Sequence, residues 1–171
     1  VDVMEGIGWE NSEIATGSTI LIRPNQTTPD ADGNTVYADK RVRQALAMAV
    51  DNNICLELGY ANKGAPADNH HAGSMHPEHD PSVGRLPYDP AKAKALMAEA
   101  GMADYEHELI SIDDDWRKNT TDAVAAQLRD AGIKVKRTIL PGSTFWNDWA
   151  KYPFSSTNWN HRPFAVQVWG L

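Results

Sequence analysis

Segments typical of strands and of helices alternate along most of this chain. Short runs rich in β-branched and apolar residues predict strands at 19–23, 107–112, 133–140 and 154–159. Stretches with helical spacing of apolar residues predict helices at 39–49, 53–59, 88–101, 116–131 and 144–150. Such an alternation favours an α/β fold, in which helices pack on a mixed or parallel sheet.

The helix expected at 88–101 has the clearest boundaries. Asp89 is suited to cap its first turn, Pro90 occupies the first helical position, and Gly101 follows the last apolar residue. By the same reasoning, Asp39 predicts the start of one helix and Gly59 the end of another.

Periodicity disappears between residues 60 and 86, in a stretch rich in Gly, Pro, Asn and His. A segment of this length without regular structure is unusual in a compact domain. We therefore expect it either to wrap the surface or to line a site.

Composition excludes several classes of protein. The 171 residues are 42% hydrophobic and 23% charged, which is typical of a soluble globular domain. The net charge of −7 argues against nucleic acid or an anionic membrane as the main partner. Cys55 is the only cysteine, so an internal disulfide and a CxxC site are excluded. Because apolar stretches are too short for a membrane helix, we expect no direct membrane insertion.

Both ends of the sequence look cut. The chain begins without an initiator Met or the basic and apolar regions of a secretory signal, and residues 165–171 form an apolar run typical of a strand. We expect the chain to be a piece of a longer protein whose signal peptide lies upstream.

Three segments in order resemble one family. KRVRQALAMAVD at 40–51, YDPAKAKALMAEAG at 88–101 and AQLRDAGIKV at 126–135 are similar to motifs of bacterial ABC-transporter solute-binding proteins of the dipeptide/oligopeptide-binding type, family 5. The matches span most of the chain.

The resemblance implies a fold and a place in a larger receptor. Residues 1–171 would form part of the second, C-terminal lobe, a three-layer arrangement of the type II periplasmic-binding-protein kind, with residues 1–18 as an inter-lobe or N-terminal extension. The receptor would be a periplasmic monomer that closes around a solute, peptide by default, and delivers it to an ABC permease.

The segment that begins at Trp159 is the main candidate for solute contact. In peptide-binding relatives the tryptophan here is followed three positions on by an aspartate for the ligand's amino group, and often preceded by an arginine for its carboxylate. This chain has Arg162 and Ser156 at those positions. The resemblance thus implies an inverted charge, with Arg162 binding a carboxylate or phosphate of an anionic, non-peptide solute. Trp159 would form an apolar wall, and Asn160 and His161 would supply hydrogen bonds. The alternative is a structural ion pair of Arg162.

Four of the six histidines lie between residues 70 and 79. Asn69, His70 and His71 are candidates for the ligand cleft, although a solvated loop is the simpler interpretation. A second hypothesis is a metal-binding protein or metal-dependent hydrolase that uses His70–His79, with Glu78 as base or ligand. Because no HExxH motif or helical spacing supports it, we expect neither a metal nor another cofactor.

The remaining motifs favour structural roles. Asp113–Asp115 is expected to cap the following helix, and Trp146 and Trp149 to pack in the core. Cys55 lies in an apolar helical stretch and is expected to be a core residue. No GxSxG, P-loop or GxGxxG motif occurs. The resemblance to solute-binding proteins implies a binding module and not an enzyme.

Overall fold

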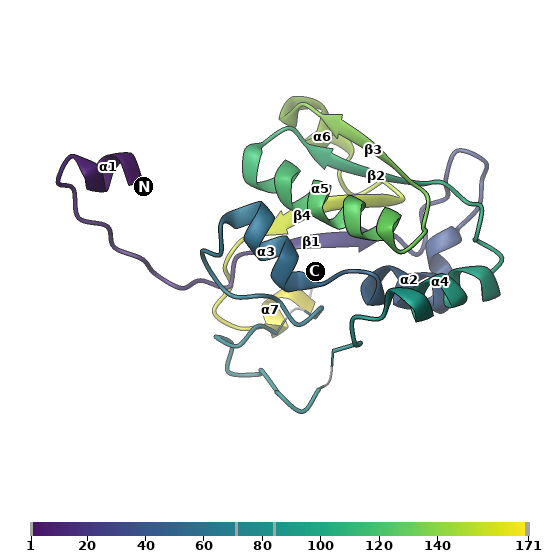
Figure 1. The fold of residues 1–171 in the computed structure, drawn as a ribbon, viewed down its shortest axis with the longest axis horizontal. Helices are drawn as coiled ribbons and strands as arrows, with labels where there is room; N and C mark the ends of the chain where they lie inside the picture. The colour runs from purple at the N-terminus through teal and green to yellow at the C-terminus, as the bar shows by residue number, and fades with distance from the viewer. Residues whose placement is uncertain (1, 71, 84, 170–171) are drawn as a thin grey trace.

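A mixed four-stranded sheet forms the centre of the molecule (Figure 1). The computed structural model describes residues 2–70, 72–83 and 85–169, without the side chains of residues 2, 168 and 169. The strands are β1 (Thr19–Pro24), β2 (His107–Ile112), β3 (Val135–Leu140) and β4 (Phe154–Trp159), in the order β1-β4-β2-β3. All four predicted strands are therefore confirmed to within two residues.

The register of the sheet places the end of β4 beside the start of β1. These two strands are antiparallel, with Thr19 opposite Trp159 and Pro24 opposite Phe154. Strand β2 is parallel to both β3 and β4. Trp159 thus lies at one end of the sheet, where the chain leaves β4.

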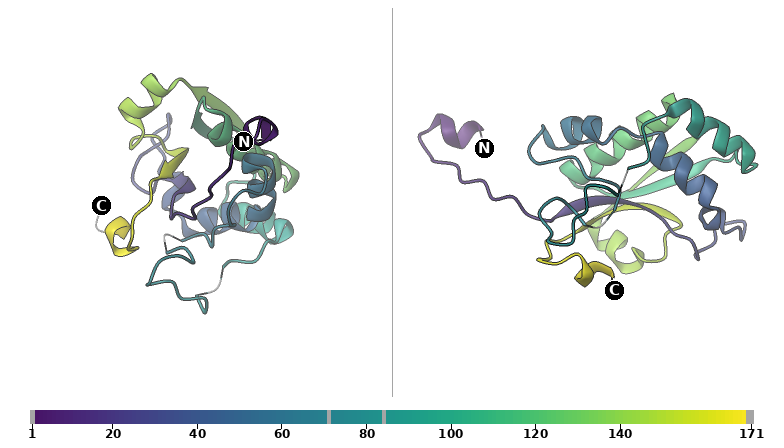
Figure 2. Two further views of the ribbon diagram at one scale, coloured as in Figure 1. Left: turned by 90° about the vertical axis from the view of Figure 1, so that its left-hand side faces the viewer. Right: turned by 90° about the horizontal axis from the view of Figure 1, so that it is seen from below.

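Helices cover both faces of the sheet, as predicted. Between β1 and β3 the chain forms the 3-10 turn η1 (Val36–Ala38) and the helices α2 (Lys40–Met48), α3 (Asn52–Tyr60), α4 (Pro90–Glu99) and α5 (Asp115–Asp130). Figure 2 shows α2–α5 on one side of the sheet and α6 (Gly142–Asp148) on the other. The predicted three-layer α/β architecture is confirmed.

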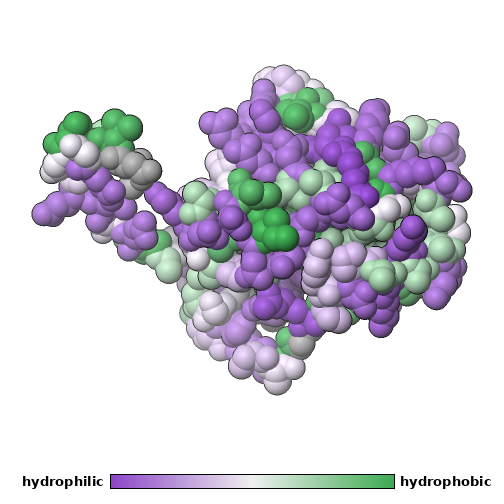
Figure 3. Space-filling model, in the orientation of Figure 1, coloured by the Kyte–Doolittle hydropathy of each residue, from purple (hydrophilic) through white to green (hydrophobic). Residues whose placement is uncertain are grey.

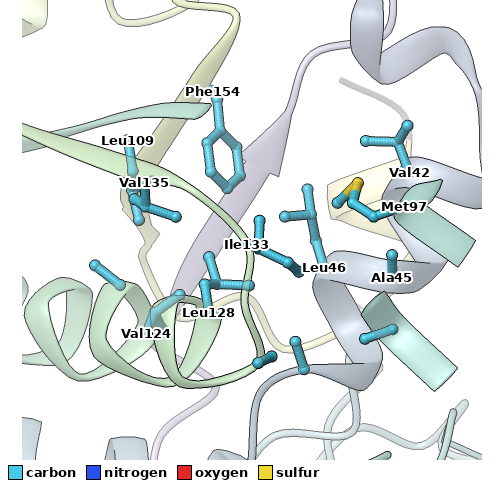
Figure 4. Packing of buried hydrophobic residues seen from close by; sticks show 14 of the residues in the cluster. Val42, Ala45, Leu46, Met97, Leu109, Val124, Leu128, Ile133, Val135 and Phe154 are labelled. Carbon is cyan, nitrogen blue, oxygen red and sulfur yellow. The ribbon is translucent and has the colours of Figure 1, made fainter. Parts of the chain in front are cut away.

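Two apolar clusters hold these layers together because strand side chains alternate between faces. Leu109 faces the larger cluster with Phe154, and the adjacent Ile110 faces the smaller one with Phe145. Figure 4 shows Leu46 of α2 and Leu128 of α5 in the larger cluster. Burial of such side chains contributes about 1.5–3 kcal/mol each.

The helix boundaries follow their capping residues. Asp39 and Asp89 accept hydrogen bonds from the backbone N–H groups of Arg41 and Lys92, at 2.8 and 2.9 Å. Gly101, after α4, has a φ of +74° that glycine adopts without strain.

Two expected helix signals are wrong in detail. Gly59 lies inside α3, which ends at Tyr60, and Ala61 takes the left-handed cap. Asp114 occupies the N-cap position of α5 but does not cap it with its side chain, since its carboxylate pairs with Arg117 at 2.9 Å.

The two ends of the chain form short helices. A helix, α1 (Asp2–Gly6), precedes an extended segment that projects from the body of the molecule (Figure 1). The strand expected at 165–171 is wrong, because Val166–Trp169 forms helix α7; residues 170 and 171 lie outside the described part of the chain. Glu78 explains the difference, since its carboxylate accepts hydrogen bonds from the backbone N–H groups of Ala165 and Val166.

The face of the molecule shown in Figure 3 is mainly hydrophilic, with apolar patches over α1 and α3. Ile54 and Leu58, one helical turn apart, are exposed apolar residues of α3, and Tyr60 at its end is exposed as well. None of the helices in the described ranges is long and apolar enough to span a membrane.

Candidate functional site

A hollow of about 320 Å³ opens at the end of β4. Its lining comes from α5, from α6 and its C-cap, from the end of β4 and from the segment after that strand: Arg117, Trp146, Trp149, Thr157, Asn158, Trp159, Asn160 and Arg162. Three residues predicted for solute contact, Trp159, Asn160 and Arg162, therefore lie together. The volume is at the lower end of the range for small-molecule pockets.

Three tryptophans form the apolar part of this hollow, which we call the tryptophan hollow. The Trp149 and Trp159 ring centroids are 6.3 Å apart with planes at 86°, and those of Trp146 and Trp149 are 6.4 Å apart at 64°. Near-perpendicular rings at this distance attract one another edge to face. As the packing prediction requires, Trp149 packs against the smaller apolar cluster, and both Trp146 and Trp149 also line the hollow.

Residues outside the lining of the hollow fix the positions of Trp146 and Trp149. Arg23 of β1 lies over the Trp149 ring at 4.6 Å and donates a hydrogen bond to the Trp149 carbonyl oxygen. Phe145, the fully buried residue of α6, contacts the ring of Trp146 edge to face. The aromatic wall is therefore preorganised, which reduces the entropy cost of binding.

Polar groups of the hollow are also oriented by neighbours. Asn158 Oδ1 accepts a hydrogen bond from Arg117 Nε at 2.8 Å, and Asn158 Nδ2 lies 3.3 Å from Asn160 Oδ1. Thr157 is buried, and its hydroxyl has no hydrogen-bond partner among the described residues. A buried hydroxyl of this kind is suited to bind a polar atom of a solute.

The charge of the hollow is positive. Arg117 is balanced by Asp114, whereas Arg162 forms no ion pair within the described ranges. No carboxylate belongs to the lining residues. A planar guanidinium without a partner next to aromatic rings can bind a carboxylate or phosphate in bidentate fashion.

His161 contacts the segment that precedes β1. Its Nδ1 accepts a hydrogen bond from the backbone N–H of Gly17 at 2.9 Å, and the backbone N–H of His161 donates to Ser18 Oγ at 3.0 Å. His161 does not belong to the lining of the tryptophan hollow. It therefore fastens the segment before β1 to the segment after β4.

The second group of predicted residues lies elsewhere. Asn69 accepts a hydrogen bond from Asn52 Nδ2 at 2.8 Å and so joins the long segment to α3. His70 lies near Asp68 and His79. Neither Asn69 nor His70 lines the tryptophan hollow, and His71 falls outside the described residues.

Another hollow, of about 460 Å³, is larger, but its only charged lining residue is already engaged. It is lined by Gly33, Asn34, Thr35, Val36, Asp39, Met102 and Tyr105. Its one charged side chain, Asp39, is engaged by Arg41 and by the start of α2. The tryptophan hollow is the better candidate because its charged group is available.

Cys55, the only thiol, is confirmed as a core residue. It is 8% exposed and accepts a hydrogen bond from Gln127 Nε2 at 3.3 Å. Burial raises the pKa of its thiol to about 11, so it stays protonated and is a poor nucleophile at neutral pH.

The described residues form a three-layer α/β body with an aromatic and cationic hollow at one end of its sheet. Residues 2–167 match the family described as bacterial extracellular solute-binding proteins, family 5 Middle. The chain belongs to this family. The predicted family is therefore confirmed.

Individual relatives share parts of the chain. Di/tripeptide-binding protein 2 of Pseudomonas aeruginosa is 35% identical over 88 residues, which are 50% of this chain and 16% of that protein. Peptide-bound OppA of Listeria monocytogenes has a TM-score of 0.68 at 25% identity, over 86% of this chain and 31% of that one. NikA of Brucella suis, in complex with Fe(III)-EDTA, has a TM-score of 0.74 at 21% identity, over 95% and 34%. The chain thus spans about a third or less of these relatives.

Proposed function

We propose that this chain is one solute-binding lobe of the receptor of a bacterial ABC importer. Membership of the extracellular family supports this assignment, as do the names of relatives that bind peptides. In this proposal residues 1–171 belong to the second lobe, and residues 1–18 are an extension towards the rest of a longer receptor. The complete receptor works in the periplasm as a monomer and delivers its solute to the permease.

The solute is a small molecule with a carboxylate or phosphate and an apolar or planar portion. The observation that carries this proposal is the position of Arg162 beside Trp159 in a hollow whose lining includes no carboxylate. An ammonium group would meet two guanidinium groups there, at an electrostatic cost. A free peptide amine is therefore a poor match for this hollow, although the carboxylate end of a peptide is a suitable one.

Closure of the two lobes supplies the remaining contacts. Solute bound to the tryptophan hollow would be covered by the opposite lobe, and contacts from both sides would stabilise the closed state over the open one. Exclusion of water would then strengthen the interaction of Arg162 with the anionic group.

Calorimetry on the full-length receptor tests the proposal. Titrations with small carboxylates, phosphorylated solutes, sugars and dipeptides should find binding among the anionic classes. For the solute that binds, R162A should weaken affinity at least about tenfold, since a charge-assisted hydrogen bond is lost. The matched control is K151A, which removes an exposed cation outside the hollow and should leave affinity unchanged. Unchanged affinity in R162A, or binding of sugars alone, would refute the assigned role of Arg162.

A further inference from the structure

Three potential metal ligands converge in the long segment between α3 and α4. One ligand atom from each of Asp68, His70 and His79 lies within 4.8 Å of the others. The sequence singled out this histidine-rich region without indicating which of its residues meet. Folding selects His70 and His79 and adds Asp68, which the sequence pattern did not suggest.

The contacts within this group leave one imidazole nitrogen unused. His79 Nε2 is 3.2 Å from Asp68 Oδ2, and the rings of His70 and His79 are stacked with centroids 6.1 Å apart. His70 Nε2 is buried and has no hydrogen-bond partner within the described ranges. A buried nitrogen without a partner is costly, and a bound cation would remove that cost.

Neighbouring residues hold the three ligands in place. Asn52 Nδ2 donates to the Ala67 carbonyl oxygen at 2.7 Å, which fixes the backbone next to Asp68. The backbone N–H of His79 donates to the His76 carbonyl oxygen, and His76 Nε2 lies 3.0 Å from the Arg162 carbonyl oxygen. The ligands therefore come from two anchored stretches of an otherwise irregular segment, which lies below the body of the molecule in Figure 1.

One histidine and one glutamate of the histidine-rich region, His76 and Glu78, are engaged in other hydrogen bonds. His76 Nδ1 accepts a hydrogen bond from the Gly73 N–H. Glu78, which was considered as a base or fourth ligand, accepts from the start of α7. Neither residue belongs to the group that converges on Asp68.

The ligand types of the group, two imidazoles and one carboxylate, fit a transition metal better than calcium or magnesium. Two imidazoles and one carboxylate are ligands that Zn²⁺ takes at about 2.0–2.2 Å, which places ligand atoms about 3.3 Å apart in a tetrahedron. The His79–Asp68 separation of 3.2 Å agrees with this spacing. Arg85 approaches the other carboxylate oxygen, Asp68 Oδ1, at 3.2 Å, so Oδ2 remains for the metal.

We propose that Asp68, His70 and His79 bind one divalent transition metal of the zinc class, with water as the fourth ligand. The metal links the stretch that holds Asp68 and His70 to the stretch that holds His79, and so stabilises this part of the chain. It is not a site for the transported solute, because none of its ligands lines the tryptophan hollow. The proposal does not depend on the function proposed above.

Zinc titration of the full-length protein, expressed without an affinity tag and freed of metal with a chelator, tests this site. One equivalent of Zn²⁺ should bind and raise the melting temperature, and Co²⁺ should give the visible absorption of a tetrahedral complex. H70Q and H79Q should each weaken Zn²⁺ binding at least about tenfold, as one of three protein ligands is lost.

Two further variants separate ligation from damage to the fold. H161Q removes a histidine outside the group and should bind Zn²⁺ as the unaltered protein does. H79C exchanges one zinc ligand for another and should retain the single equivalent. Absence of saturable Zn²⁺ binding to the unaltered protein would overturn the proposal, as would equal affinity in H70Q, H79Q and H161Q.

Discussion

His107 shows most clearly how one buried residue links stability to pH. Its side chain is fully buried at the start of β2, and its Nδ1 lies 3.1 Å from the hydroxyl of Tyr37. The ring meets Tyr105 edge to face at 4.8 Å. Burial lowers the pKa of His107 to about 4, so the imidazole is neutral in the folded protein at physiological pH.

Acid should destabilise the protein partly through this residue. The unfolded chain binds a proton on His107 near pH 6.5, whereas the folded protein does so only near pH 4. The folded state therefore loses stability as pH falls through this window, by a total of about 3 kcal/mol. H107F should flatten the fall in the free energy of unfolding between pH 6.5 and 4, measured by urea denaturation at several pH values.

The same variant carries a cost at neutral pH. Without the imidazole, the buried Tyr37 hydroxyl has no partner at that position, so H107F should lower the free energy of unfolding at pH 7 by about 1–3 kcal/mol. Parallel pH profiles for the two proteins would contradict the neutral state of His107.

At the scale of elements, the close contact between α3 and α5 depends on Gly59. A Cβ atom at this position would lie 2.8 Å from Thr120 Cα, a backbone atom of α5 that cannot move independently. The glycine is therefore selected for its small size inside a helix. The close approach also explains why Gly59 does not end the helix.

Replacement of this glycine should push the two helices apart. G59A should lower the free energy of unfolding by about 1–3 kcal/mol, the usual cost of overpacking, despite the better helix propensity of alanine. The matched control is G6A in α1, where a Cβ meets no atom within 4 Å, and which should change stability by less than about 0.5 kcal/mol. Chemical denaturation of both variants measures the difference, and equal stabilities would refute the close contact.

At the scale of the whole molecule, the tryptophan hollow is one half of the binding site that we propose. A surface that contacts a solute from one side leaves its other side in water. Solute affinity therefore depends on contacts from the second lobe and on the exclusion of water by closure.

Separation of the lobes should reveal this dependence. For the solute identified by calorimetry, this 171-residue chain should bind at least about 100-fold more weakly than the full-length receptor, which corresponds to about 2.7 kcal/mol. Circular dichroism of the isolated chain is the control for folding. Equal affinities of a folded chain and the full receptor would show that the hollow is a complete site.

The sequence was informative wherever structure depends on local interactions. The Asp89–Pro90 start and the Gly101 end of α4 were predicted because capping involves residues within one turn of each other. The strands were predicted from short apolar runs, and their alternation with helices indicated the α/β class. Errors arose at Gly59 and Val166, whose conformations depend on Thr120 and Glu78, residues distant in the sequence.

The residues of the candidate site also fall into those that the sequence could predict and those that only the fold brings together. Trp159, Asn160 and Arg162 could be proposed together because they are neighbours in the chain. Arg117, Trp146 and Trp149 could not, since they come from α5 and from the region of α6, and their spacing also suits core residues. Similarly, the histidine count indicated a possible metal site, but only the folded segment brings Asp68 to His70 and His79.

The order of strands and helices, the family and the unusual charge at Arg162 are properties of the sequence itself, because each depends on residue types and local spacing. The tertiary structure alone decides that three tryptophans line the same hollow as this arginine and that His161 is engaged with Gly17. It also decides which histidines meet an aspartate. These arrangements depend on packing between elements that are far apart in the chain, and no local pattern encodes such distances.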